Sequence, residues 1–327
     1  MSELHSFLFE GLPVRGMLVR LTDSWQEVLR RHRQSGGYPM AVTELLGEMS
    51  AAAVLMQGNI KFNGALILQV FGDGPVKLAV AEAQPDGSFR ATATVRGEVA
   101  DGVPLSHMVN IHNGGRCAIT LDPKDRLPGQ QPYQGVVPLF GDRREKLERM
   151  SDVLEHYMLQ SEQLDTRLVL AANDQMAAGL LIQRMPTLGE ANLSGQAAAQ
   201  AREDAIGRSD DYNRIALLAA SLQKHELLTL DADTILHRLF WQEPLQRFEP
   251  AAGVRRPRFA CSCSRERVAG MLQGLGVAEV DSILAEQGRV DIGCEFCGVH
   301  YVFDPVDAAQ LFVSGSRVPS TGPGQVH

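Results

Sequence analysis

The chain has 327 residues, enough for two domains, and its 44% hydrophobic content supplies a sizeable core. A net charge of −8 argues against a protein whose main task is to hold nucleic acid phosphates. Residues 1–10 do not resemble a signal peptide, and no uncharged apolar run approaches the roughly 18 residues of a membrane span. We therefore expect a cytoplasmic protein, in which clustered cysteines indicate metal or redox chemistry more often than structural disulfides.

The first part of the chain alternates strand and helix signals. After a strand over Val14 to Leu21, the residues Trp25, Val28 and His32 recur at helical spacing, and a second helix is expected over Thr43 to Gln57. Short apolar segments separated by turn residues then predict further strands over Ala65–Phe71, Val76–Glu82 and Phe89–Val95, and from Cys117 and from Gln134.

A long helix and a hairpin complete this part. Asp142 and Glu145 have the spacing of a capping box, which predicts a helix that begins there and continues through Met158. A closing hairpin follows and ends before Pro186. Because most of these strands are joined by hairpins, the pattern is that of an α+β domain with a mixed, mainly antiparallel sheet, which we assign to residues 1–188.

Residues 189–254 are expected to be a linker that is first flexible and then helical. Residues 189–211 have few large apolar side chains, and two amphipathic helices follow, the second capped by Asp231 or Asp233. The apolar stripe of these helices consists of Ile215, Leu218, Leu222, Ile235, Leu236, Leu239 and Phe240. Such a stripe can cover an apolar face of the first domain, either reversibly or, as is commoner, by permanent packing.

Residues 255–313 are expected to form a small separate domain, followed by a polar tail over 314–327. Ser264 can cap a helix, a second helix ends at Gly288, and two short strands flank a C-x-x-C turn. Asp304 and Pro305 open a last helix.

Four of the five cysteines lie in this domain, as a C-x-C pair and a C-x-x-C pair. Two such pairs can place four sulfurs at the corners of one tetrahedron, which predicts one zinc ion per chain held by Cys261, Cys263, Cys294 and Cys297. His300 is a weaker alternative ligand. The simplest function of such a zinc ion is to let a small domain fold.

Arginines flank the C-x-C pair, namely Arg255, Arg256, Arg258, Arg265 and Arg267. Positive charge keeps sulfurs in the thiolate form that oxidants attack, so the site is a candidate redox sensor. The alternative is that the arginines only offset the charge of the cluster. If oxidation occurs, Cys294 and Cys297 can bridge easily within a turn. Cys261 and Cys263 lie near the limit of disulfide geometry, with Cα atoms about 7 Å apart in an extended chain.

Other candidate sites are weaker. Gly72 to Pro75 is expected to be a tight turn, the polar loop of His107, His112 and Asn113 lacks a nucleophile, and Cys117 is expected to be an inert core thiol. The sequence contains no nucleophile elbow, no H-E-x-x-H motif and no P-loop, so we do not expect an enzyme.

The chain resembles the family of redox-regulated heat-shock chaperones, the thirty-three-kilodalton chaperonins. The resemblance covers nearly the whole chain and is carried by eight segments, which begin at Phe9, Gly72, Tyr133, Tyr157, Leu236, Cys261, Glu279 and Cys294. The segment from Cys261 reads CSCSRER, and the last segment reads Cys294-Glu-Phe-Cys-Gly-Val-His-Tyr-Val-Phe.

This resemblance implies an ATP-independent holdase that binds unfolding proteins under oxidative stress. It implies that the four cysteines hold zinc in a reduced, inactive state. Oxidation then forms the disulfides Cys261–Cys263 and Cys294–Cys297, releases zinc and unfolds the linker. It also implies unfolded clients and a homodimer when the protein is active, with no nucleic acid or membrane partner.

Two alternative functions belong to other classes of protein. One is a zinc ribbon that binds nucleic acid, and the other is a thiol oxidoreductase that uses Cys294 and Cys297.

Overall fold

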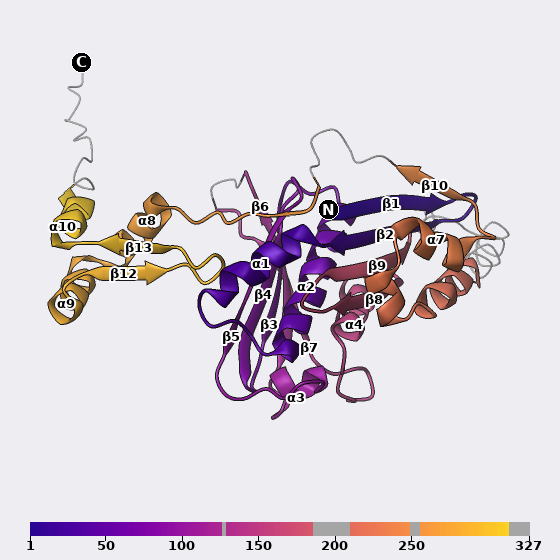
Figure 1. Ribbon diagram of the computed structural model, residues 1–327, viewed down its shortest axis with the longest axis horizontal. Helices are drawn as coiled ribbons and strands as arrows, with labels where there is room; N and C mark the ends of the chain where they lie inside the picture. Colours follow the sequence, from indigo (N-terminus) through magenta and orange to yellow (C-terminus); the bar gives the residue numbers. More distant parts are fainter. Residues whose placement is uncertain (126–128, 186–209, 249–255, 314–327) are drawn as a thin grey trace, which may run out of the picture. The chain divides into compact units, whose positions relative to one another are not determined.

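The computed structural model of the protein describes residues 1–125, 129–185, 210–248 and 256–313 (Figure 1). The chain divides into two compact units, Met1–Ala260 and Cys261–His327. The expected linker segment 189–209, the residues 249–255 and the tail lie outside the described residues.

The first unit contains two sheets. The five-stranded sheet, sheet A, has the order β10-β1-β2-β9-β8 and is antiparallel throughout. Its strands are β10 (Leu245–Phe248), β1 (Glu3–Phe9), β2 (Val14–Leu21), β9 (Ala177–Arg184) and β8 (Thr166–Ala172).

The six-stranded sheet, sheet B, has the order β11-β5-β4-β3-β6-β7, and only its β11–β5 pair is parallel. Its strands are β11 (Arg258–Phe259), β5 (Ser88–Val95), β4 (Val76–Ala83), β3 (Gly64–Phe71), β6 (Arg116–Pro123) and β7 (Tyr133–Pro138). The predicted α+β class with mainly antiparallel strands is confirmed.

The helix α2 (Met40–Asn59) contacts strands of both sheets and supplies much of the main core. Residues on all its sides are buried, as expected for a helix covered by protein all round. The other helices of this part are α1 (Asp23–Arg33), α3 (Leu105–Val109) and α4 (Met150–Glu162). The indole of Trp25 in α1 donates a 2.8 Å hydrogen bond to the carbonyl of Asn173, which fixes α1 against the β8–β9 turn.

The predicted capping box at Asp142 and Glu145 is wrong, because α4 begins only at Met150. The amide of Gly141 donates to the carbonyl of Glu145 at 2.9 Å, and Arg144 takes a left-handed φ of 61°. The carboxylate of Glu145 accepts from the amide of Arg143 at 2.9 Å, so it closes a tight turn instead of capping a helix.

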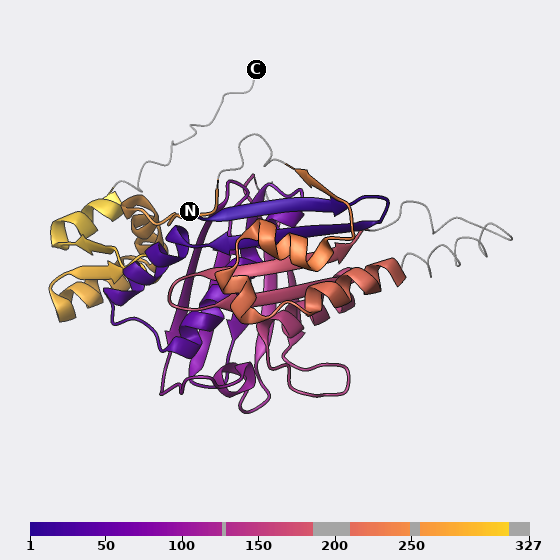
Figure 2. The same ribbon diagram turned by 45° about the vertical axis from the view of Figure 1, so that its right-hand side comes forward.

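Sheet A is buried on both faces. Because successive side chains of a strand point to opposite faces, Met17, Val19 and Leu21 of β2 face the core around α2, and Leu18 faces the other way. That second face is covered by helical residues 210–220, α6 (Lys224–Thr229) and α7 (Ala232–Phe240) (Figure 2). Five of the seven residues of the predicted apolar stripe belong to this second buried cluster, and the other two, Leu218 and Leu239, are partly buried and pack against it.

The second unit is small. It contains α8 (Arg265–Leu275), α9 (Val277–Gln287), the antiparallel pair β12 (Val290–Gly293) and β13 (His300–Phe303), and α10 (Pro305–Val313). Ser264 and Asp304 cap α8 and α10 as the sequence predicts, and Gly288 ends α9 with a φ of 74°. Within residues 261–313 of this unit, the buried hydrophobic core cluster consists of Leu272, Val280, Val290, Phe303 and Ala308.

In the described part of the chain, no single helix has the length and hydropathy needed to cross a membrane. α8 and α9 meet that criterion only when taken together, and they are bent by 107° relative to each other.

Candidate metal centre

The second unit brings the four predicted sulfurs together. Cys261 and Cys263 lie in the extended segment before α8, and Cys294 and Cys297 lie in the turn between β12 and β13. All four sulfurs lie within 4.8 Å of one another. Sγ of Cys261 is 3.6 Å from that of Cys294, and Sγ of Cys263 is 3.3 Å from that of Cys297.

Backbone hydrogen bonds shape the C-x-x-C turn. The carbonyl of Cys294 accepts from the amides of Cys297, at 3.3 Å, and Gly298, at 2.8 Å. The amide of Cys294 donates to the carbonyl of Val299 at 2.9 Å, which closes the hairpin. Gly298 has a φ of 70°, which a side chain disfavours, so this glycine allows the tight turn that directs two sulfurs to one point.

The four sulfurs differ in their surroundings. Burial opposes ionisation of Cys263, but the Tyr301 hydroxyl donates to its sulfur at 3.1 Å, and the neighbouring thiols also donate, so its pKa falls to about 7. Burial raises the pKa of Cys297. One sulfur of the cluster therefore ionises readily and accepts hydrogen bonds from the others.

This donor set fits a zinc ion. Four converging sulfurs are the soft ligands that tetrahedral zinc prefers, and together they complete its coordination, as in structural sites. The buried core of this unit is also too small to stabilise a fold of this length alone. His300 does not belong to the cluster, because its Nδ1 lies 2.7 Å from Oδ1 of Asp291.

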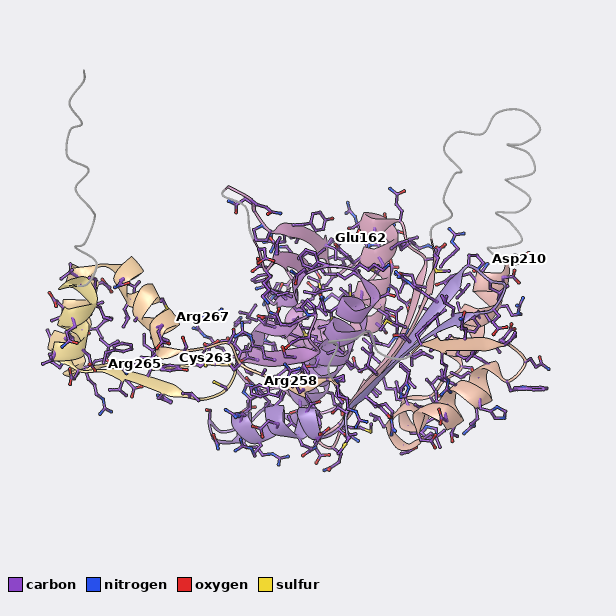
Figure 3. The ribbon with its side chains drawn as sticks, turned by 90° about the horizontal axis from the view of Figure 1, so that it is seen from above. Glu162, Asp210, Arg258, Cys263, Arg265 and Arg267 are labelled. Carbon is purple, nitrogen blue, oxygen red and sulfur yellow. The ribbon has the colours of Figure 1, made fainter. Side chains whose placement is uncertain are left out.

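Two of the flanking arginines are held by groups other than the sulfurs. Arg265, at the start of α8 near Cys263 (Figure 3), donates to Asp307 and to the carbonyl of Val302, both at 2.7 Å. Its guanidinium lies 4.1 Å from the ring centre of Phe303. Arg258 pairs with Asp86 in the first unit, and Arg255 lies outside the described residues. Arg265 therefore holds α8 to α10 and β13, a structural function that its position next to the C-x-C pair did not indicate.

The other candidate residues have structural functions. Cys117 is fully buried in β6, and burial raises the pKa of its thiol to about 12, as expected for an inert core thiol. The carboxylate of Asp73 accepts from the amides of His112 at 3.1 Å and Gly114 at 2.6 Å, so the polar loop is fastened to the turn at Gly72 to Pro75.

The contact between the linker helices and sheet A is mainly apolar. Phe240 at the end of α7 is 2% exposed, and its ring packs edge-on against Phe9 of β1 with centroids 5.0 Å apart. Among the described residues, one ion pair joins these helices to α2, since Nζ of Lys224 in α6 lies 2.8 Å from Oε1 of Glu48. Burial raises the pKa of Glu48, and the nearby positive charge of Lys224 lowers that pKa in part. The sequence pattern did not reveal this pair, because its partners are far apart in the chain.

Three comparisons with known proteins agree with this geometry. The model of the Hsp33 protein family matches residues 2–304. The chain is 46% identical to a 33 kDa chaperonin of Chromobacterium violaceum, over 95% of this chain and 93% of that protein. It is 42% identical to a 33 kDa chaperonin of Methylobacillus flagellatus, over 97% of this chain and 96% of that protein. The crystal structure of the 33 kDa chaperonin of Thermotoga maritima has the same fold. Its TM-score is 0.70 at 18% identity, over 95% of this chain and 98% of that one.

Proposed function

The chain belongs to the Hsp33 family, and from this premise we propose that oxidation of its cysteine cluster releases the linker helices from sheet A. The protein is a redox-regulated chaperone with a C-terminal four-cysteine zinc site, and it is not an enzyme. Membership in a chaperone family also implies that its partners are unfolded client proteins.

The observation that carries the proposal is the apolar face of sheet A beneath the linker. Phe7, Phe9, Leu18, Leu180 and Ile182 on that face are all buried, and the helices that bury them bring an apolar stripe of their own. Removing the helices would expose both surfaces together. Contiguous exposed apolar surface binds unfolded chains, because these display apolar side chains that native proteins hide.

The chemistry of activation is the oxidation of thiols to disulfides. Two cysteine sulfurs give two electrons to one peroxide molecule, so one S–S bond forms and the O–O bond breaks. The two oxygens leave as two molecules of water, with protons from the thiols or, where the sulfurs are zinc-bound thiolates, from the solvent. Two disulfides consume four thiols and two peroxide molecules. The zinc ion, when bound, holds the four sulfurs together, and their oxidation removes its ligands.

We infer that the disulfides are Cys261–Cys263 and Cys294–Cys297. In a four-sulfur cluster every pair is close, so the 3.6 Å and 3.3 Å contacts between the C-x-C and C-x-x-C pairs do not decide the outcome. Once the cluster opens, the partner nearest in sequence is the easiest to reach, because the entropy of closing a loop grows with its length. Local pairs also leave the two halves of the unit unlinked, so that it can unfold.

Coupling to the linker follows from the order of the chain. The chain runs from the linker through β11 (Arg258–Phe259) to the cluster, and Cys261 follows β11 after one residue. β11 contributes only two residues to sheet B, held by hydrogen bonds from Arg258 to Gly87 and from Ala260 to Phe89. While the cluster is intact, it fixes the chain directly after this short strand. Unfolding of the second unit frees that end, and the linker can then detach.

We divide the chain into a core over 1–188, a regulatory linker over 189–254, a redox-switch domain over 255–313 and a tail over 314–327. We also propose that the active form is a homodimer, and that the protein acts in the cytoplasm, where reducing conditions keep the four cysteines from forming disulfides.

The direct test is a count of zinc and thiols before and after peroxide treatment, with peptide mapping of the oxidised sample. We expect one zinc ion and five thiols to become no zinc and about one thiol, that of Cys117, since its burial protects it. Mapping should find each disulfide within one short peptide. Retained zinc after loss of four thiols, or a bond between Cys261 and Cys294, would contradict the scheme.

A further inference from the structure

The outer edge of β1 is covered by a short strand from the linker region. β10 pairs antiparallel with β1 over four positions, from Ser6 opposite Phe248 to Phe9 opposite Leu245. Three of the four β10 side chains, Gln246, Arg247 and Phe248, are exposed, and Leu245 is half-buried. Leu245 packs on the second apolar cluster, but most of the contact consists of backbone hydrogen bonds, which any polypeptide sequence can supply.

The backbone pattern shows which groups of β1 face outward. The amide of Glu10 donates to the carbonyl of Pro244 at 2.9 Å, in register with the β1–β10 pair. Successive backbone amides of a strand point alternately to its two neighbouring strands. The amides of Leu8 and Ser6, two and four residues before Glu10, therefore point to β10 as well. The opposite edge of β1 is paired with β2 from Glu3 to Leu8, so sheet A keeps β1 when β10 is removed.

An apolar cavity lies beside this edge. It has a volume of about 670 Å³, and Leu4 and Ser6 of β1 line it together with Met17, Val54 and Phe62. Phe248 at the end of β10 also lines it. A strand that takes the place of β10 can therefore place an apolar side chain in this cavity while its backbone pairs with β1.

On two other strand edges of the first unit, side chains of the core itself block pairing. On β5, β11 covers only Ser88 and Phe89, and beyond it His32 contacts the carbonyl of Ala91 at 2.8 Å and the Tyr38 hydroxyl accepts from the amide of Ala93 at 3.0 Å. On β8, the carboxylate of Glu155 accepts from the amide of Leu168 at 2.7 Å. Such caps prevent pairing with other chains. The edge of β1, by contrast, is protected by a segment of the linker region, so its protection depends on linker docking.

We propose that the outer edge of β1 binds an extended segment of an unfolded client as an added antiparallel strand, in the place that β10 occupies in the docked state. This inference rests on the proposed release of the linker. It gives client binding a second component besides apolar contact. Backbone pairing recognises an extended chain of any sequence, and folded proteins seldom offer one with unpaired amides.

The test measures amide hydrogen exchange at Ser6, Leu8 and Glu10 in the full-length protein. The three states are the reduced zinc form, the peroxide-oxidised form, and the oxidised form with a peptide of about eight alternating valines and threonines. We expect slow exchange in the first state, fast exchange in the second and slow exchange again in the third. The amides of β3, at the centre of sheet B, serve as the internal control and should stay slow throughout.

A second peptide of the same sequence, N-methylated at alternate residues along one edge, separates backbone pairing from apolar contact. We expect it to bind at least about tenfold more weakly, since two or more hydrogen bonds are lost. In the protein, Ser6→Pro removes one outward amide and spares the pairing with β2, because proline is tolerated on an edge. It should weaken binding of the first peptide about tenfold, and Ser6→Ala, which keeps the amide, should not.

The outcomes are distinguishable. Amides that stay slow after oxidation would show that the linker does not leave, which would overturn the proposed function. Amides that become fast and remain fast with bound peptide, or equal affinity for both peptides, would overturn the inference alone. Protection that appears without peptide and grows with protein concentration would assign the edge to a second copy of the chain and also overturn it.

Discussion

Replacing Phe240 with alanine is expected to produce a chaperone that suppresses aggregation while its thiols are still reduced. Phe240 packs against Phe7 and Phe9 in the contact between the linker and sheet A. Replacing a buried phenylalanine with alanine lowers the stability of the packed state by about 3–5 kcal/mol, which changes the equilibrium constant between packed and unpacked states by more than a hundredfold. Because the ring lies between α7 and the sheet, most of this loss falls on docking of the linker.

The measurement is light scattering of a thermally unfolding client, in the presence of reduced protein whose zinc content has been confirmed. Trp241→Ala is the matched control, because the neighbouring Trp241 is also a large aromatic residue but is 67% exposed. The control should remain inactive until it is oxidised. If reduced Phe240→Ala protein were as inactive as the control, the surface beneath the linker would not be the client-binding surface.

Replacing Cys297 with serine is expected to unfold the second unit without any oxidant. Structural zinc contributes on the order of 10–16 kcal/mol to the folding of such units, and a hydroxyl is a poor substitute for a thiolate. The five buried core residues of this unit cannot compensate for that loss. The amide signals of α8, α9 and α10 should collapse to unfolded positions, and those of β3 and β6 should keep their native positions.

Cys117→Ala is the matched control for Cys297→Ser. It also removes one of the five thiols, but from the core of sheet B. We expect it to keep one zinc ion and a folded second unit, and to lower the stability of the first unit by about 1–2 kcal/mol. A Cys297→Ser protein that remains folded from α8 to α10 would show that this unit does not depend on the metal.

The sequence predicts most of the first unit and the whole cysteine cluster, for two physical reasons. Strands β2 to β6 and the helix α2 bury regular apolar patterns, so local periodicity identifies them. The cluster forms from two short sequence motifs whose spacing alone restricts where the sulfurs can lie.

The sequence pattern fails where tertiary contacts decide the structure. It predicts no strand over Glu3–Phe9, because the half-buried β1 has a mixed pattern of polar and apolar residues. It also misses β10 and β11, since each is very short and pairs with a partner more than 150 residues away in the chain. The capping-box spacing at Asp142 is misleading because the same side chains can close a turn.

Aggregation of a thermally unfolding client, followed with the same wild-type sample before and after peroxide treatment, tests the redox switch most directly. The reduced, zinc-bound protein should leave the aggregation rate unchanged. The oxidised, zinc-free protein should suppress aggregation at near-equimolar amounts without ATP, and reduction with zinc should reverse the effect. Equal suppression by both forms would contradict control by the cysteine cluster, and failure of both forms would contradict client binding by the surfaces beneath the linker.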